Sequence, residues 1–149
     1  MPIGILWPTF ALVALIFVVF VVMFYQRGRH TRANPPRDSD FATTEAAMRY
    51  FEPVEMPANN YRNLFEMPLL YFALVPLLLI TRQADHLQIV LAWVYVILRI
   101  IHSFIHIGPK VVTWRAAAYA LSALVLMAMW IVFFVDMLHA QAVISAAGG

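Results

Sequence analysis

A group of strongly polar side chains stands at the start of an otherwise apolar segment, between Asn59 and Pro68. On a helix that turns 100° per residue, Asn59, Asn63 and Glu66 fall at about 0°, 40° and 340°, so they share one narrow stripe. Arg62 lies on the flank of that stripe. Because polar groups at the mouth of an apolar segment need a reason, we expect the chemistry of this protein to take place there.

A second polar stripe occurs in the apolar segment that follows, at about 87–107. On one helix, Arg99, His102 and His106 fall at about 0°, 300° and 340°. Ionisable residues inside a membrane span are costly unless they are paired or face a wet cavity. These side chains are therefore candidates for a functional site.

Two alternatives remain open for the stripes. A pair between Glu66 and Arg99 could serve only to fix how the two helices pack. His102 and His106, four residues apart, could ligate a metal such as zinc, but no third ligand beyond Glu66 is evident and Arg99 would repel a cation. We predict no metal site. A structural pair would need two residues rather than six, which favours function for the full set of Asn59, Asn63, Glu66, Arg99, His102 and His106.

The composition is that of an integral membrane protein. Of the 149 residues, 63% are apolar and 12% are charged, and the mean hydropathy is +0.78. These values lie far outside the range of soluble domains. The chain has no cysteine, so any sulfur chemistry must use the thiol of a substrate. It also lacks the basic and aromatic pattern that binds nucleic acid, and we expect no such partner.

Four apolar segments are long enough to cross about 30 Å of hydrocarbon. They are predicted at about 3–25, 61–80, 87–107 and 115–138. The connection at about 26–58 is polar, two consecutive prolines exclude a helix there, and Thr43 or Thr44 could cap a short helix after them. We predict an all-α fold, a bundle of four transmembrane helices that forms a single domain over residues 1–149.

Basic residues predict the orientation of the bundle. They are concentrated in the first connection and near the third, whereas the second has only Arg82 and the termini have none. Cytoplasmic connections carry the excess of basic residues, so the first and third should be cytoplasmic and both termini should lie on the outer side. The residues that decide this are Arg27, Arg29, Arg32, Arg37, Arg49, Arg62, Lys110 and Arg115.

This topology brings the two stripes together near the cytoplasmic face. The second helix leaves the cytoplasm with Asn59 to Glu66 in its first two turns, and the third arrives there with Arg99 to His106 in its last two. Glu66 and Arg99 each lie roughly 10 Å inward along their helices. We therefore expect these two side chains to pair.

With these motifs the chain resembles the MAPEG family, the membrane-associated proteins of eicosanoid and glutathione metabolism. The resemblance covers about 59–115 in motif and all four spans in architecture, and it is greatest to the bacterial branch. One motif is Asn63-Leu-Phe-Glu66 with a following Pro68. The other is Tyr95-Val-Ile-Leu-Arg99-Ile-Ile-His102.

The resemblance implies a homotrimer in the bacterial inner membrane, with glutathione bound as a cosubstrate between adjacent subunits near the cytoplasmic face. The residues that match Asn63, Glu66 and Arg99 hold the polar groups of glutathione in the family, and a His or Tyr matches His102. An arginine at the start of the fourth helix, here Arg115, assists the thiol in prostaglandin-E-synthase-like members.

Two positions depart from the family pattern. An arginine usually found one turn before the asparagine is Asn59 here, although Arg62 could reach the same region. A tyrosine commonly found one turn after the His102 position is His106. We include Asn59, Arg62 and His106 among the expected glutathione contacts.

Thiol activation follows from simple electrostatics. A free thiol has a pKa of about 8.5, so only a few per cent is thiolate at neutral pH. An arginine beside the sulfur lowers that pKa, and a shift of about 1.5 units corresponds to roughly 2 kcal/mol and makes the thiolate the major form. The nucleophile then comes from the cosubstrate, which suits a chain without cysteine.

The leading hypothesis is thus a membrane enzyme of the glutathione transferase or peroxidase type. Its catalytic residue would be Arg115, and its second substrate an apolar electrophile dissolved in the membrane lipid. One alternative is a non-catalytic membrane subunit for assembly or lipid binding. Another is a small transporter, which would need a continuous polar path, whereas the outer halves of the helices look too apolar for one.

Overall fold

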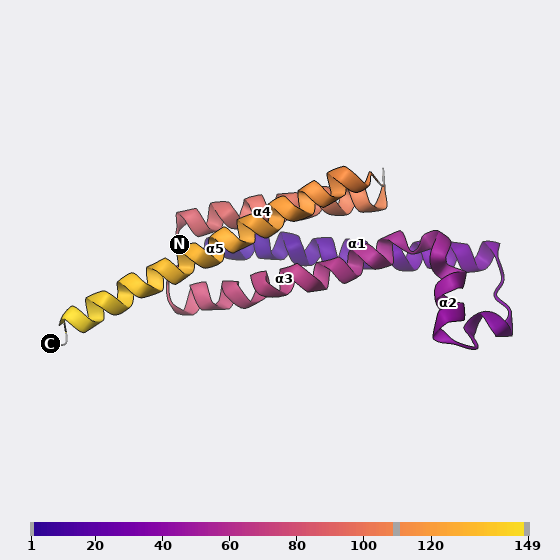
Figure 1. The fold of residues 1–149 in the computed structure, drawn as a ribbon, viewed down its shortest axis with the longest axis horizontal. Helices are drawn as coiled ribbons and strands as arrows, with labels where there is room; N and C mark the ends of the chain where they lie inside the picture. Colours follow the sequence, from indigo (N-terminus) through magenta and orange to yellow (C-terminus); the bar gives the residue numbers. More distant parts are fainter. Residues whose placement is uncertain (1, 109–110, 148–149) are drawn as a thin grey trace.

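The four apolar runs form four long helices in the computed structural model, which describes residues 2–108 and 111–147 (Figure 1). Each is long and apolar enough to cross a membrane. No strand is found in these ranges. The predicted all-α class with four membrane helices is confirmed. The long helices are α1 (Leu6–Ala33), α3 (Met56–Ile80), α4 (His86–Ile107) and α5 (Val112–Ala147).

The short elements lie at the N-terminus and in the first connection. They are the 3₁₀ helices η1 (Pro2–Ile5), η2 (Asp38–Phe41) and η3 (Glu52–Val54), and the α-helix α2 (Thr44–Phe51). Thr43 caps α2, because its side chain accepts a hydrogen bond of 3.2 Å from the backbone N–H of Ala46. One of the two predicted caps is thus confirmed.

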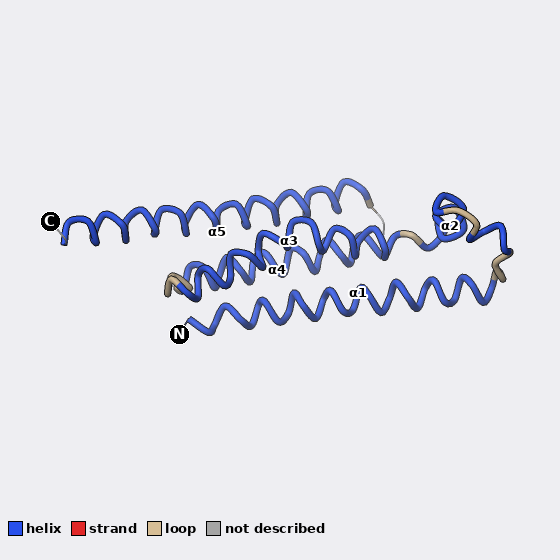
Figure 2. The backbone as a smooth tube through the Cα atoms, turned by 90° about the horizontal axis from the view of Figure 1, so that it is seen from below, coloured by secondary structure: helices blue, strands red, loops and turns tan. Residues whose placement is uncertain are grey.

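The long helices are arranged with α3 and α4 between α1 on one side and α5 on the other (Figure 2). The most extensive packing is that of α4 against α5, while α1 packs against both α3 and α4. Figure 1 shows the N-terminus and the turn between α3 and α4 at one end of the bundle. The first connection with α2, and the end of α4, lie at the other end. Successive long helices therefore run in alternating directions along the bundle, as the predicted topology requires.

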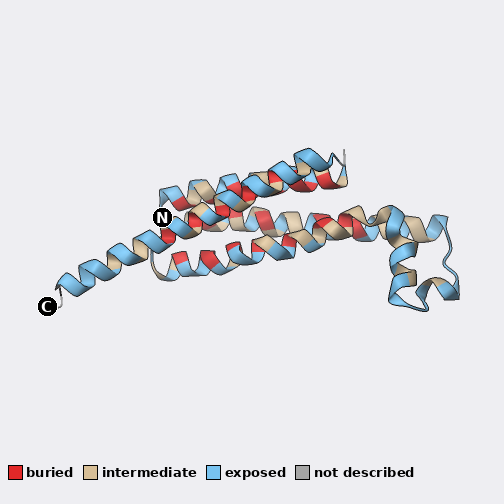
Figure 3. Cartoon of the chain, viewed as in Figure 1, coloured by how far each residue is buried: buried red, intermediate tan, exposed pale blue. Residues whose placement is uncertain are grey.

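The buried residues lie on the facing sides of the helices, and the outer sides are exposed (Figure 3). Many of the exposed residues are large and apolar. Leu74, Tyr95 and Met129 are fully buried, whereas Trp7 is 67% exposed and Phe104 is 71% exposed. In water such a surface would be unstable. In a bilayer it faces lipid tails, which identifies an integral membrane protein.

Two helices continue beyond the spans predicted from hydropathy. The first was expected to end at Tyr25, but α1 runs to Ala33, where the N–H of Asn34 donates to the carbonyl of His30 at 2.8 Å. Likewise α5 passes the expected end at Leu138 and reaches Ala147. A helix can continue in water until a residue breaks it, so the limits of an apolar run do not set its length.

The prolines near the site do not prevent helix formation. Pro57 was expected to bound the short helix, but it lies in the first turn of α3, where a missing N–H costs no hydrogen bond. Pro68 lies inside α3, as a membrane helix tolerates. In the third connection α4 ends at Ile107 and is capped by Gly108. Two residues that were expected to break this helix or to mark the cytoplasmic side, Pro109 and Lys110, lie outside the described ranges.

Candidate functional site

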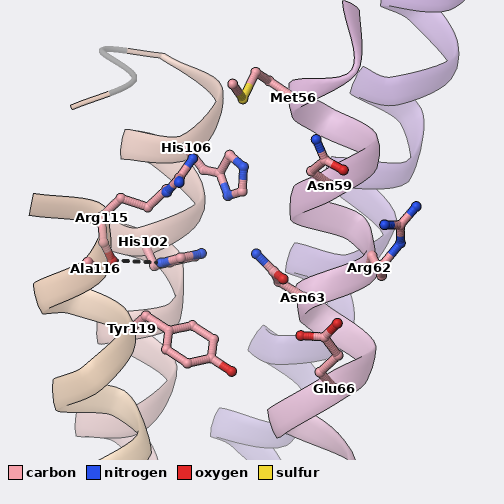
Figure 4. Close-up of a pocket in the computed structure, with 10 residues that line it drawn as sticks. All are labelled: Met56, Asn59, Arg62, Asn63, Glu66, His102, His106, Arg115, Ala116 and Tyr119. Atoms are coloured by element: carbon pink, nitrogen blue, oxygen red, sulfur yellow. Dashed lines mark hydrogen bonds between the residues drawn. The ribbon is translucent and has the colours of Figure 1, made fainter. Parts of the chain in front are cut away.

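A cavity of about 600 Å³ lies between α3, α4 and α5, toward the end of the bundle that carries the first connection (Figure 4). Seven of the eight predicted site residues line it, and Arg99 does not. The two polar stripes therefore do meet. The lining residues are Met56, Asn59, Arg62, Asn63, Glu66, His102, His106, Arg115, Ala116 and Tyr119.

The first wall is the stripe on α3. Figure 4 shows Asn63 and Glu66 directed across the cavity toward the opposite wall, and Arg62 on the outer flank of the same helix. Asn59 and Asn63 are partly buried, while Arg62 and Glu66 are exposed. Helical spacing produces this arrangement, because positions 59, 63 and 66 recur on one face of α3. The charged groups of this wall lie at its open side.

The opposite wall is formed by α4 and the start of α5. His102 is 2% exposed and His106 is 3% exposed. Nδ1 of His102 lies 3.1 Å from the backbone oxygen of Arg115. A carbonyl oxygen can only accept, so Nδ1 carries the proton and the Nε2 of a neutral His102 ring is an acceptor. This contact also fixes the first turn of α5 against α4.

Arg115 takes its place in the cavity because α5 returns along α4 immediately after the third connection. It is partly buried, and Figure 4 shows it in the same wall as His102 and His106, across from the α3 stripe. Its guanidinium is thus a positive charge on the side of the cavity opposite Glu66. A ligand between the two walls would meet both charges.

Arg99 lies behind the cavity lining and is fully buried. Its Nη2 donates to the backbone carbonyl of Asn63 at 2.8 Å, and the guanidinium lies 5.3 Å from the ring centroid of Tyr119. Within the part of the chain that the structure describes, its Nε and Nη1 have no hydrogen-bond partner. Most of the donors of this cation are therefore unused.

The prediction of an ion pair between Glu66 and Arg99 is wrong. In the described ranges the structure contains one ion pair, Arg27 with Glu55, at 3.1 Å. Arg99 reaches a carbonyl of the facing helix instead, and the Glu66 carboxylate stays at the exposed side of the cavity. A backbone carbonyl satisfies a buried guanidinium without the cost of burying a second charge.

Several residues near the cavity were not predicted. Tyr119 lies one turn after Arg115 on α5, so the helical spacing from Arg115 could have identified it. Asn60 is fully buried and accepts a hydrogen bond of 3.3 Å from the Ser103 hydroxyl, which joins α3 to α4 behind the cavity. Asn60 falls about 100° from Asn59 on the helix, so the stripe did not include it.

The arrangement suits a small polar ligand better than a metal ion. Among the residues that the structure describes, no group of three or more metal-ligating side chains comes together. The cavity instead offers guanidinium groups, one carboxylate, amides and imidazoles on two facing walls. Such a set can hold a molecule that carries both carboxylates and an amine.

Comparison with known protein families identifies a match over most of the chain. The model of the MAPEG family matches residues 5–135, nearly the whole chain. The matched region contains every residue of the cavity. No curated protein and no solved structure matches the chain significantly.

Proposed function

The chain belongs to the MAPEG family, whose members include glutathione transferases and peroxidases as well as non-catalytic proteins. From that premise we propose that it is a membrane enzyme that activates the thiol of glutathione, or of a related thiol, for attack on an apolar electrophile or lipid peroxide. The observation that carries the proposal is the cavity that gathers seven separately predicted polar residues.

The cavity fits glutathione by size and by charge. Its volume of about 600 Å³ is within the usual range for small-molecule sites. Glutathione has two carboxylates, one ammonium group, two amides and a thiol. Arg62 and Arg115 match the negative groups, Glu66 matches the ammonium group, and the side chains of Asn59 and Asn63 match the amides.

Arg115 is the group we assign to thiol activation. Its guanidinium is partly buried, so it stabilises an adjacent thiolate more strongly than an arginine in water would. The thiol proton passes to water at the open side of the cavity. The thiolate sulfur then forms a bond to the electrophilic atom while the bond between that atom and its leaving group breaks, and the leaving group departs with the electron pair. With a lipid hydroperoxide the bond that breaks is O–O, so the sulfur is oxidised to a sulfenic acid and the peroxide is reduced to an alcohol. Arg115 lies in the first turn of α5, so an electrophile in the bilayer can approach between the helices.

The remaining residues position the thiol carrier. Arg99 binds the carbonyl of Asn63 and so holds α3 at its place against α4. His102 holds the backbone of Arg115, and its Nε2 is an acceptor for a donor of the ligand. His106 supplies a further polar contact in the same wall.

We also propose that the protein acts as a homotrimer, with the site at a subunit boundary facing the cytoplasm. Glu66 supports this, because its carboxylate is exposed on a membrane helix about 15 Å along α3 from Met56. A carboxylate in contact with lipid at such a depth is unfavourable. A neighbouring subunit that covers this side of the cavity removes the unfavourable contact. Basic residues are concentrated near this end of the bundle. Because such residues are in excess on the cytoplasmic side of a membrane, we assign this end to the cytoplasmic face of a bacterial inner membrane.

A non-catalytic membrane subunit is the second candidate, since the family includes such members. It would use the same helices for assembly or lipid binding and would leave Arg115 without a reaction to assist. Thiol chemistry at Arg115 separates the two candidates.

The test is to purify the full chain in detergent, add glutathione and measure the ultraviolet absorbance of the thiolate at neutral pH. We expect a thiolate signal for the wild type and a loss of most of it for Arg115→Ala, since about 1.5 pKa units of stabilisation disappear. Arg49→Ala, at an exposed position on α2, is the matched control and should behave as the wild type. Absence of a wild-type signal, together with no stabilisation by glutathione, would refute the enzymatic proposal.

A further inference from the structure

A second cavity, of about 350 Å³, lies along the end of α1 beside the first connection. Its wall includes Tyr25, Gln26, Arg29, His30, Asn34 and Val54. It shares no lining residue with the cavity between α3, α4 and α5. It is therefore a separate candidate site.

The depth of this cavity matches the headgroup region of a bilayer. The apolar run of α1 ends at Tyr25, and the headgroup region occupies roughly 5 to 8 Å on each side of the hydrocarbon. Because α1 continues as a helix, Arg29 and His30 lie about 6 and 8 Å beyond Tyr25 along its axis. These two side chains thus stand at the level of lipid phosphates.

The wall has the chemistry of an anion site with an apolar side. Arg29 and His30 offer cationic or N–H donors, and the amides of Gln26 and Asn34 offer further donors. None of the lining residues is acidic. The nearby carboxylate of Glu55 is paired with Arg27 at 3.1 Å.

The first connection holds the wall in shape. The Tyr50 hydroxyl donates to the backbone carbonyl of Asn34, and the Tyr50 ring lies edge-on to His30 with centroids 5.0 Å apart. The Arg27 guanidinium lies 4.8 Å from the ring centroid of Phe51. Because α2 is thereby fixed against α1, the part of the wall formed by His30 and Asn34 is in place before a ligand binds.

We propose that this cavity binds the phosphate of an anionic phospholipid, with Arg29 as its main contact. A guanidinium binds phosphate through two parallel hydrogen bonds, and His30 and Asn34 supply additional donors. Soluble phosphate esters carry the same group. The lipid is the occupant we assign, because Tyr25 and Val54 give the cavity an apolar side where α1 enters the membrane.

The experiment titrates the full chain, in an uncharged detergent, with phosphatidylglycerol, phosphatidylcholine or glycerol 3-phosphate, and counts bound molecules by native mass spectrometry. Phosphatidylglycerol should bind more tightly than either other compound. Arg29→Gln should weaken its binding about fivefold, as expected for one arginine at an anionic headgroup. Arg29→Lys keeps the charge but loses the two parallel hydrogen bonds, so it should weaken the binding by less than Arg29→Gln does. Arg32→Gln, at an exposed position on α1 outside the cavity, is the matched control and should bind as the wild type does.

Three outcomes would overturn the proposal. Equal binding of the two lipids, or equal loss in Arg29→Gln and Arg32→Gln, would mean that no specific anion site exists at Arg29. Binding of glycerol 3-phosphate as tight as that of phosphatidylglycerol, and dependent on Arg29, would assign the cavity to soluble phosphate esters instead of lipid.

Discussion

Arg99 is a cation with five N–H donors in a fully buried position, and among the described residues it has one hydrogen bond and one contact with an aromatic face. Burying a charged group with so few partners costs on the order of several kcal/mol of folding free energy. A residue kept only for packing would be replaced easily by an apolar side chain of the same length. Its hydrogen bond to the carbonyl of Asn63, a residue of the cavity wall, instead indicates that Arg99 positions that wall.

Arg99→Met tests that interpretation at the level of one residue. The methionine fills similar space, and the carbonyl of Asn63 belongs to a helix, so little hydrogen bonding is lost. We expect the ligand-free variant to unfold at the wild-type temperature or above it, because the cost of the buried charge is gone. The increase in unfolding temperature caused by glutathione should disappear. Thermal unfolding in detergent, with and without glutathione, measures both effects.

The matched control for Arg99→Met is Arg82→Met, which removes an exposed arginine from the turn between α3 and α4. It should retain the response to glutathione. A different outcome for Arg99→Met, namely strong destabilisation with an unchanged glutathione response, would make Arg99 a purely structural residue.

The elements show which parts of the site the sequence could predict. Helical periodicity correctly placed Asn63 and Glu66 on the face of α3 that meets α4 and α5, because side-chain direction on a helix depends only on position. The depth at which the two stripes meet followed from the topology and a constant rise per residue. Periodicity and topology therefore sufficed to bring these residues together.

Contacts that depend on the distance between helices were not predictable in this way. Glu66 and Arg99 were expected to pair from their depth alone, but Arg99 contacts the carbonyl of Asn63, which lies nearer to it. Asn60 was missed because it makes a packing contact outside the two stripes. Tyr119 was missed because it lies on α5, to which no polar stripe was assigned, although its spacing from Arg115 places it in the same wall. The ends of α1 and α5 were missed because hydropathy identifies only the part of a helix that spans the membrane, and both helices continue beyond that part.

The extension of α1 supports a prediction about the first connection. Arg27 pairs with Glu55 and covers Phe51, but the two charged side chains are 31% and 27% exposed. A partly exposed pair is worth about 1 kcal/mol or less, so Arg27→Ala should barely change the unfolding temperature of the bundle. It should instead free α2 from α1 and speed tryptic cleavage after Arg37 severalfold. Limited proteolysis of the purified protein measures this rate.

Arg32→Ala is the control for the proteolysis experiment, because Arg32 is exposed on the same helix and makes no ion pair within the described ranges. Its cleavage after Arg37 should match the wild type. Equal cleavage rates in Arg27→Ala and the wild type would show that these contacts do not hold α2 in place.

Over the whole molecule, polar and apolar surfaces are separated by depth. The sides of the bundle are apolar, while the arginines of the first connection gather at one end with both cavities nearby. If that end faces the cytoplasm, the proposed thiol site would open to soluble cosubstrates, and the proposed site at Arg29 would open to the lipids of the inner leaflet. Both proposals thus require the same orientation.

The orientation can be tested directly, because the chain has no cysteine and each introduced one is unique. Ser39→Cys lies in the first connection and His139→Cys near the other end, and both positions are exposed. The distribution of basic residues predicts that a maleimide unable to cross membranes labels His139→Cys from the outer side of bacterial spheroplasts. It should label Ser39→Cys only after the membrane is opened. The wild type, which should stay unlabelled, is the control.

The opposite labelling pattern would invert the bundle and place the cavity with Arg115 on the outer side, away from cytoplasmic thiols. Labelling of both positions from one side would contradict a topology in which α1 to α5 cross the membrane four times. With the predicted pattern, the proposed reaction would receive its apolar electrophile from the bilayer and its thiol carrier from the cytoplasm. The two proposed substrates would then meet in the cavity between α3, α4 and α5.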